Sequence, residues 1–185
     1  VRAAVRRRAM GHLRSEAPVT TDRIRLVPLS QRHLDATLTW VNDPEMMRLL
    51  GRRSPVEPDE HLRWFASLSS RPEHRYFAVE TIAGDHLGNI WLWDIDTHDR
   101  KAEVRVLFGS SAARGRGYGS EAIDAVSRLA FDTLRLSRVY AYVFSSNPRA
   151  KRAFEKAGFE VEGLLRRDRL VGGSPVDVWI LGRLA

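Results

Sequence analysis

Residues 114–119 read Arg-Gly-Arg-Gly-Tyr-Gly, and a helical pattern of residues begins directly after them at Ser120. The segment just before them, residues 104–108, reads Val-Arg-Val-Leu-Phe and is typical of a strand. A glycine turn between a strand and a helix favours an anion, because the first helical N–H groups lack partners and the helix dipole is positive at that end. Glycines also allow positive φ angles and a close approach of a ligand to the backbone. We therefore expect this turn to bind a pyrophosphate group.

The spacing of the glycines excludes two common nucleotide-binding motifs. A P-loop requires Gly-x-x-x-x-Gly-Lys-Ser/Thr, and this turn contains no lysine. A Rossmann turn requires Gly-x-Gly-x-x-Gly after the first strand, whereas Gly115-x-Gly117-x-Gly119 follows several predicted elements. Taken alone, the segment would be interpreted as a glycine-rich surface loop.

The composition is that of an ordinary globular domain. The chain has 185 residues, of which 43% are hydrophobic and 29% charged, enough for one domain with a core and cramped for two. It lacks the run of about 18 apolar residues that a membrane-spanning helix needs, so no membrane partner is expected. The absence of cysteine excludes disulfides and a cysteine nucleophile, and it fits a cytoplasmic protein. The six histidines lack H-x-x-x-H spacing, so we expect no metal.

The positive charge is concentrated at the start of the chain. The formal net charge is +7, and residues 1–17 contain five arginines against one glutamate. We interpret residues 1–19 as a disordered basic leader and residues 20–185 as the folded domain. The alternative is that the leader is an arm that binds RNA or the ribosome. Because the remaining chain carries little excess charge, nucleic acid is not expected as a partner of the domain.

The hydrophobic periodicity predicts a mixed α/β domain with antiparallel strands first and one strand–helix–strand crossover late. The run 138–144 is almost continuously apolar, which is typical of a buried, parallel strand. Gly88 is interpreted as a bulge, and Leu62, Trp64, Phe65 and Leu68 as one buried helical stripe. Strands are predicted over residues 23–29, 75–81, 87–95, 101–108, 138–144, 159–167 and 177–184, and helices over 30–40, 44–50, 58–70, 119–134 and 147–156.

The second half of the chain resembles the GNAT N-acetyltransferase superfamily. The resemblance covers about residues 104–167 and rests on Arg114-x-x-Gly117-x-Gly119 before a helix, Asn147-x-x-Ala150, and Phe154-x-x-x-Gly158-Phe159. It implies a GNAT fold, in which helices flank a central, mostly antiparallel mixed sheet with one parallel, splayed strand pair. Within the superfamily the chain is similar to the RimJ/RimL branch, which acetylates ribosomal-protein N-termini and includes amino-sugar and antibiotic acetyltransferases. The segments behind this are 21–26, 42–45, 158–163 and 177–181.

The resemblance implies acetyl-CoA as the donor, bound without a metal. Backbone N–H groups of about residues 116–120 would bind the pyrophosphate, and the pantetheine arm would lie between the splayed strands. Asn147 would lie near the thioester, although it also fits an N-cap. The residues expected to bind the donor are Leu107, Phe108, Arg114, Gly115, Arg116, Gly117, Tyr118, Gly119, Ser120, Asn147, Arg149, Ala150, Arg152 and Phe154.

Direct attack of an amine on the thioester needs a base for the ammonium proton and an acid for the leaving thiolate. Glu103 is the candidate base, and a salt bridge with Arg105 is its alternative role. Many relatives carry a tyrosine as the acid seven residues after the asparagine, but that position here is Phe154. Ser145 and Tyr142 are the candidate hydroxyl groups, and water is the alternative.

The acceptor pocket is expected to come from the first half of the chain. The expected lining residues are Trp40, Asn42, Glu45, Trp64, Trp91 and Trp93, with core packing as the alternative for the aromatic ones. The acceptor implied by the RimJ/RimL resemblance is a protein or peptide N-terminal amine. The alternatives are a small amine, such as an amino-sugar nucleotide or an aminoglycoside-type antibiotic, and a degenerate acyl-CoA-binding regulatory domain. Because many relatives dimerise, a homodimer is also considered.

Overall fold

The computed structural model describes residues 18–109, residue 113 and residues 115–185. Most of the predicted leader therefore lies outside the described residues. Val19 and Thr20 form a short strand paired with Leu26 and Arg25, so this strand includes one residue before the predicted domain boundary. No helix in the described part of the chain has the length and apolar character to cross a membrane.

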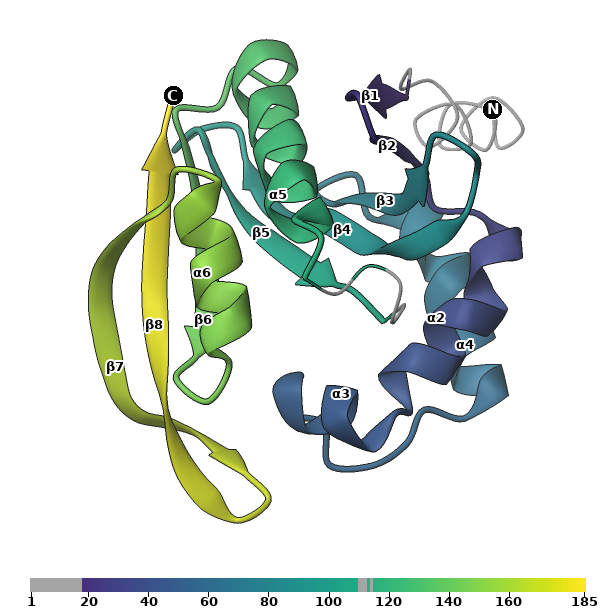
Figure 1. Cartoon of the computed structure of the whole chain (residues 1–185), viewed down its shortest axis with the longest axis vertical. Helices are drawn as coiled ribbons and strands as arrows, with labels where there is room; N and C mark the ends of the chain where they lie inside the picture. The colour runs from purple at the N-terminus through teal and green to yellow at the C-terminus, as the bar shows by residue number, and fades with distance from the viewer. Residues whose placement is uncertain (1–17, 110–112, 114) are drawn as a thin grey trace, which may run out of the picture.

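The described residues form one eight-stranded mixed sheet with helices on both faces (Figure 1). The spatial order of the strands is β1-β2-β3-β4-β5-β6-β8-β7. The strands are β1 (Val19–Thr20), β2 (Ile24–Pro28), β3 (Arg75–Thr81), β4 (His86–Asp96), β5 (Lys101–Leu107), β6 (Arg138–Phe144), β7 (Glu160–Val171) and β8 (Ser174–Leu184). The helices are α2 (Leu34–Val41), α3 (Pro44–Leu49), α4 (Pro58–Ser67), α5 (Tyr118–Arg128) and α6 (Pro148–Lys156), with short turns η1 (Gln31–His33), η2 (Leu68–Ser70) and η4 (Leu129–Thr133).

One strand pair is parallel, and it separates after three residue pairs. β5 and β6 pair from Lys101 opposite Arg138 to Glu103 opposite Tyr140, and every other pairing in the sheet is antiparallel. β6 pairs along its whole length with β8 on its other side. The predicted fold, a mostly antiparallel mixed sheet with one parallel, splayed pair flanked by helices, is confirmed.

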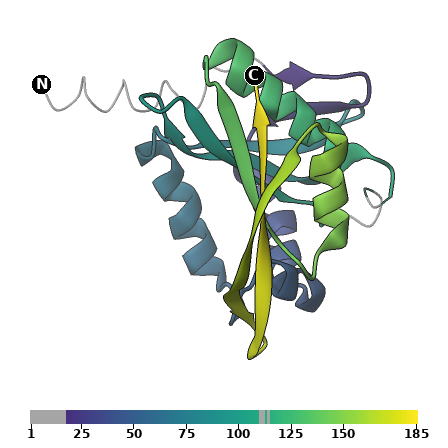
Figure 2. The ribbon, with the colours of Figure 1, turned by 90° about the vertical axis from the view of Figure 1, so that its left-hand side faces the viewer.

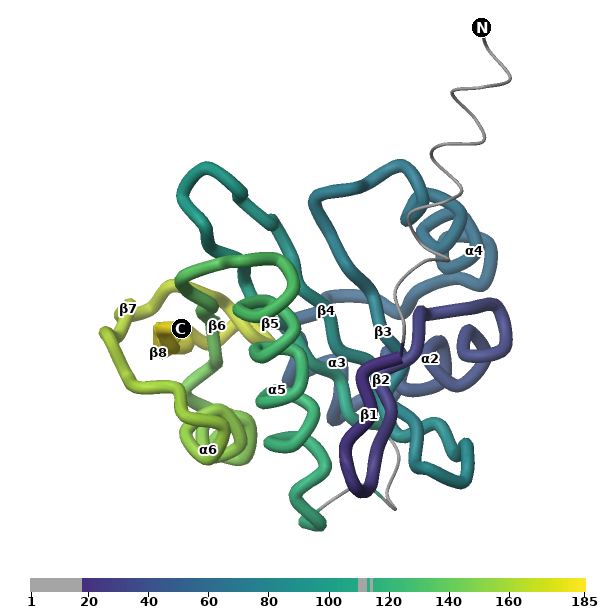
Figure 3. The backbone as a smooth tube through the Cα atoms, turned by 90° about the horizontal axis from the view of Figure 1, so that it is seen from above, coloured from purple at the N-terminus to yellow at the C-terminus, as the bar shows by residue number. Residues whose placement is uncertain are grey.

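Two hydrophobic layers hold the helices on the sheet. α5 and α6 lie on one side and α4 on the other, as Figure 3 shows from above. The α5 side contains the larger core, where Ile123 and Val126 are fully buried against strand residues such as Leu26 and Ile90. Burying one such aliphatic side chain stabilises the fold by about 1.5–3 kcal/mol. The predicted apolar face of this helix is therefore confirmed at these positions.

Two predictions about burial were wrong. Leu62 is 52% exposed, because the buried side of α4 follows His61, Trp64, Phe65 and then Leu68 at helical spacing and leaves Leu62 to one side. β6 is not buried on both faces either, since its residues alternate and Tyr142 is 49% exposed. Only the β6 face toward the larger core is covered, by Val139, Ala141 and Val143.

The last two strands are longer than predicted and form a twisted ribbon that extends beyond the body of the molecule (Figure 2). They meet at the predicted turn, where Gly172 and Gly173 both have positive φ angles. β7 is the edge strand and exposes four large aliphatic side chains, Val161, Leu164, Leu165 and Leu170. The sequence alternation is weak here because so little of the strand is buried.

Candidate active site

The glycine turn opens α5 with a left-handed residue. Gly117 has φ +81° and is the N-cap, and the first helical hydrogen bond runs from the Glu121 N–H to the Gly117 carbonyl at 3.1 Å. The N–H groups of residues 118–120 precede that bond, so they point out of the positive end of the helix. Gly115 also has positive φ, at +74°. Arg114 lies outside the described residues.

Close packing joins the turn to its neighbours. An added Cβ on Gly119 would lie 3.8 Å from the Phe108 ring and 3.9 Å from Ala153 of α6. An added Cβ on Gly88 would lie only 2.3 Å from the Leu107 carbonyl oxygen, so this position requires glycine. The strand register shifts beside Gly88, which confirms the predicted bulge. Leu107 is 2% exposed and Phe108 packs against the larger core.

A gap in the ladder begins next to the candidate base. Glu103 is opposite Tyr140 in the last parallel pair, and within the described chain β5 has no ladder partner on that side from Val104 to Leu107. The glycine turn follows the same strand a few residues later. The splay therefore lies between Glu103 at one end and the N-terminus of α5 at the other.

Glu103 is held by an arginine that is itself stacked. Arg105 donates to both carboxylate oxygens of Glu103 at 2.8 Å, and Glu103 is 8% exposed. The Arg105 guanidinium lies 4.3 Å from the ring centroid of Trp93. On the Trp93 ring, His74 stacks at 3.8 Å with an interplanar angle of 14°. The alternative role for Glu103, a salt bridge with Arg105, is thus present, and its role as a base stays a prediction.

A tyrosine that the sequence analysis did not select faces Glu103. Burial and the nearby Glu103 carboxylate raise the pKa of Tyr140, and its ring packs edge-on against Tyr142 at 5.8 Å. Tyr142 lies two residues past the last parallel pair, at the splay. Ser145 is exposed in the turn after β6, where its N–H donates to the Asp177 carbonyl at 2.8 Å. The Tyr140–Tyr142 alternation was a signal that could have identified Tyr140.

The start of α6 is capped by the residue expected near the thioester. The Asn147 side-chain oxygen accepts a hydrogen bond from the Ala150 N–H at 3.1 Å, so its N-cap role is present. Arg152 is exposed and Ala150 is partly buried. Phe154 is a core residue, 2% exposed and edge-on to Phe159 at 5.0 Å. Its ring fills the core and has no hydroxyl group to donate a proton.

The predicted acceptor residues fall into two groups. Trp40 and Asn42 border a hollow of about 290 Å³ that also involves Met46 and Gly109. Trp64 and Trp91 instead pack around Tyr76 between α4 and the sheet, so the packing of the core alternative is present, and their role in acceptor binding stays a prediction. Trp93 joins that cluster and reaches Arg105, as described above.

Asn42 mainly shapes the wall of the hollow. Its amide nitrogen donates to the Val56 carbonyl at 2.9 Å, and its amide oxygen accepts from the Val56 N–H at 2.7 Å. Trp40 packs against Gly109, two residues after β5, since an added Cβ on Gly109 would lie 1.9 Å from the Trp40 ring. On its other side, Trp40 packs against His86 with ring centroids 4.6 Å apart.

Comparison with known proteins places this geometry in a family. A family model described as an acetyltransferase (GNAT) domain matches residues 23–160. The chain belongs to the GNAT acetyltransferase family.

Known GNAT relatives differ in the amine they act on. The L-amino acid N-acetyltransferase AaaT of Escherichia coli K12 is 29% identical over 130 residues, covering 69% of this chain and 78% of its own. The spermidine N(1)-acetyltransferase of the same strain is 27% identical over 155 residues, covering 82% and 80%. A crystal structure of Vibrio cholerae spermidine N-acetyltransferase with CoA and spermine has a TM-score of 0.81 at 24% identity, covering 89% and 96%, and shows the shared fold.

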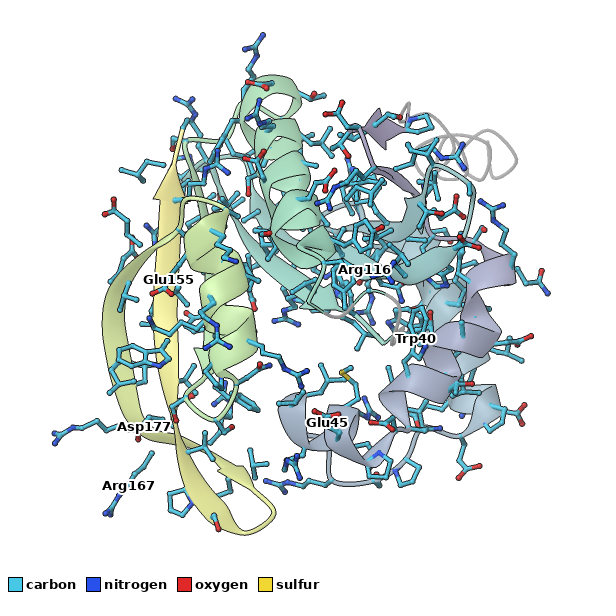
Figure 4. The ribbon with its side chains drawn as sticks, viewed as in Figure 1. Trp40, Glu45, Arg116, Glu155, Arg167 and Asp177 are labelled. Carbon is cyan, nitrogen blue, oxygen red and sulfur yellow. The ribbon has the colours of Figure 1, made fainter. Side chains whose placement is uncertain are left out.

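An ion pair between α3 and α6 connects the two halves of this GNAT domain. Arg149 of α6 donates to a carboxylate oxygen of Glu45 at 2.7 Å. Glu45 lies on α3 (Figure 4). Nearby, an added Cβ on Gly51 would lie 3.0 Å from the Phe144 ring, so the end of α3 contacts the end of β6. The structure therefore pairs a residue expected to bind the donor with one expected to bind the acceptor.

Proposed function

We propose that this GNAT domain transfers the acetyl group of acetyl-CoA to a primary amine by direct attack within a ternary complex. The observation that supports this best is the position of the splay, which runs from Glu103 to the N-terminus of α5. The N–H groups of residues 118–120 would bind the pyrophosphate, and the gap beside residues 104–107 would take the pantetheine arm. A fold neighbour described as bound to CoA is consistent with this donor.

In the proposed step, the amine nitrogen attacks the thioester carbonyl carbon. A carbon–nitrogen bond forms, the carbon–sulfur bond breaks, and coenzyme A leaves as the thiolate. The ammonium proton passes to Glu103, directly or through a water molecule. Arg105 occupies one direction on each carboxylate oxygen, and each oxygen retains a second lone pair for that proton. The thiolate takes a proton from the Tyr142 hydroxyl or from water, and the step needs no metal.

We propose a protein or peptide N-terminal amine as the acceptor, following the RimJ/RimL resemblance. The carboxylates expected to meet the amine, Glu103 and Glu45, each pair with an arginine. A polyamine, with several ammonium groups, gains little from carboxylates that are already neutralised. An N-terminal amine has an ordinary pKa of about 7.7–8.0, against about 10.4 for a lysine-like amine, so more of it is neutral near pH 7 and it needs a weaker base.

A small amine is the second candidate, which the amino acid and spermidine relatives favour. Amino-sugar nucleotides and aminoglycosides belong to the same class of acceptor. Self-association also stays a prediction: β7 exposes aliphatic side chains at the sheet edge, and one fold neighbour is described as dodecameric. We propose no membrane or nucleic-acid partner for the domain.

A mass-spectrometric acceptor screen tests the proposal. The full chain is incubated with acetyl-CoA and with peptides of varied N-terminal residue, amino acids, amino-sugar nucleotides, aminoglycosides and spermidine. We expect a mass increase of one acetyl group on peptides and little on spermidine. Acetylation of small amines alone would move the acceptor to the second candidate. Binding of acetyl-CoA without turnover on any amine would favour the regulatory-domain alternative and overturn the enzyme proposal.

A further inference from the structure

An arginine from the start of the sheet reaches the glycine turn. Arg23 lies directly before β2, and its Nη1 donates to the Arg116 carbonyl at 3.0 Å. The same guanidinium lies 5.0 Å from the centroid of the Tyr118 ring, the first residue of α5. An added Cβ on Gly117 would lie 3.5 Å from Arg23 Nη2, so the turn wraps closely around this side chain.

The contact to the Arg116 carbonyl orients the next amide. In a trans peptide unit the carbonyl of one residue and the N–H of the next point in opposite directions, and the described chain has no cis peptide bond. Because Arg23 holds the Arg116 carbonyl, the Gly117 N–H faces away from Arg23. The hydrogen bond therefore fixes which side of the turn presents its N–H groups to an anion.

Arg23 also pairs with a carboxylate near the N-terminus of α5. A carboxylate in that position is unfavourable for binding an anionic ligand. Glu121 lies in the first turn of α5, where a free negative charge would repel a pyrophosphate. Arg23 Nε donates to Glu121 Oε2 at 2.8 Å, and the Thr21 hydroxyl donates to Glu121 Oε1 at 2.5 Å. Both oxygens are thus engaged from the β2 side, and the Glu121 side chain is 17% exposed. The positive end of α5 is left available for the ligand.

From these contacts we infer that Arg23 is a positioning residue for the donor pyrophosphate. It acts through the turn and through Glu121, and it does not touch the donor. The inference rests on the proposed function, because it assumes that the turn binds acetyl-CoA. It links the residue before β2 to donor affinity across 93 residues of sequence.

The test measures CoA binding by isothermal titration calorimetry, which needs no acceptor. Arg23→Met keeps much of the length of the side chain and removes its donors. We expect its Kd for CoA to rise about tenfold, the scale of one lost charge-assisted hydrogen bond, with the stoichiometry unchanged. Inorganic pyrophosphate, used as a competitor, should lose affinity by a similar factor. A purely structural role would lower the stoichiometry, through misfolded protein, and leave the Kd unchanged.

Matched variants distinguish the possible failures. Arg128→Met removes an exposed arginine from the other end of α5, where it pairs with Asp124. The Kd of this variant for CoA should equal that of the wild type. Glu121→Gln should change the Kd less in an Arg23→Met background than in the wild type, because the two residues act together. If the wild-type chain does not bind CoA, the proposed function fails. If it binds CoA and Arg23→Met binds equally well, only the role of Arg23 is overturned.

Discussion

Glu103 is the side chain through which the proposed proton transfer runs, and Arg105 fixes its orientation. Glu103→Gln keeps a similar shape and loses the ability to take a proton. We expect kcat to fall by about 10²–10⁴-fold, the usual contribution of a general base, while the KM for acetyl-CoA changes little. Steady-state kinetics with the acceptor found in the screen measures both values.

Glu45→Gln is the comparison for that variant, since it removes a carboxylate that is expected to bind the acceptor and not to take its proton, and that pairs with Arg149. Its kcat should stay within a few-fold of the wild type, and any change should appear in the KM for the acceptor. Wild-type kcat in Glu103→Gln would remove Glu103 as the base and leave it as the partner of Arg105.

Two histidines with lowered pKa values, the buried His61 and the half-buried His86, should make the free energy of unfolding depend on pH. Burial is the main cause that lowers the pKa of His86 and of His61 below the ordinary value of 6.5. His86 Nε2 donates toward the Gly88 carbonyl and the Asn89 side-chain oxygen, while its Nδ1 is buried without a hydrogen-bond partner among the described residues. Protonation of Nδ1 would therefore create a buried N–H donor that has no hydrogen-bond acceptor among the described residues.

Because the unfolded chain binds these protons more readily, the free energy of unfolding should be highest above pH 6.5 and should fall as the pH drops toward the lowered pKa values. Urea unfolding at several pH values from 8 to 5 measures this. His86→Gln, which cannot be protonated, should reduce the decline. A stability that is constant over this range would contradict the role of burial.

At the level of elements, Asn42 joins the end of α2 to the segment before α4. Its amide makes two hydrogen bonds to the Val56 backbone. Asn42→Ala leaves those backbone groups without their partner and should lower the free energy of unfolding by about 1–3 kcal/mol. Chemical denaturation measures the loss, and Thr39→Ala, which removes an exposed hydroxyl from the same helix, is the control. A loss as small as that of the control would show that water replaces the amide.

The elements themselves were predictable where their signals are local. Gly117 has a positive φ, which glycine allows, and Asn147 caps α6 by accepting a hydrogen bond from the N–H of Ala150, three residues later. The spacing of the apolar residues of α5 can be recognised within the helix itself. Predictions were wrong where burial depends on what another element covers. Leu62 is apolar but lies beside the buried face of α4, and the alternate residues Tyr140 and Tyr142 of β6 are not buried, although the strand is almost continuously apolar in sequence.

The candidate site was less predictable because its contacts are distant in sequence. Arg149 and Glu45 are 104 residues apart, and Arg23 and Glu121 are 98 apart. The residue types alone suggested a ligand role for Arg149 and Glu45, and only the folded chain shows that they pair with each other. Tyr140 was missed for the same reason, since its partner Glu103 lies on a different strand.

At the level of the whole molecule, the sheet consists of two parts. Strands β1 to β5 form a continuous antiparallel set, and β6, β8 and β7 form another. Among the described residues, three parallel pairs between β5 and β6 are all that joins them within the ladder, although α5 and α6 also pack against each other. The proposed donor site occupies the line between these two parts.

This division has a consequence for amide hydrogen exchange. Those N–H groups of residues 104–107 that point toward β6 lack a ladder acceptor there, so their deuterium uptake should be fast for a strand this well buried. A pantetheine arm in the gap would supply acceptors and behave like a short missing strand. Saturating CoA should then slow uptake in peptides covering 104–108 while leaving those of β3 unchanged, and equal uptake with and without CoA would contradict this. Bound CoA would therefore connect the two parts of the sheet reversibly, and the protection of the strand next to the gap would rise with the CoA concentration.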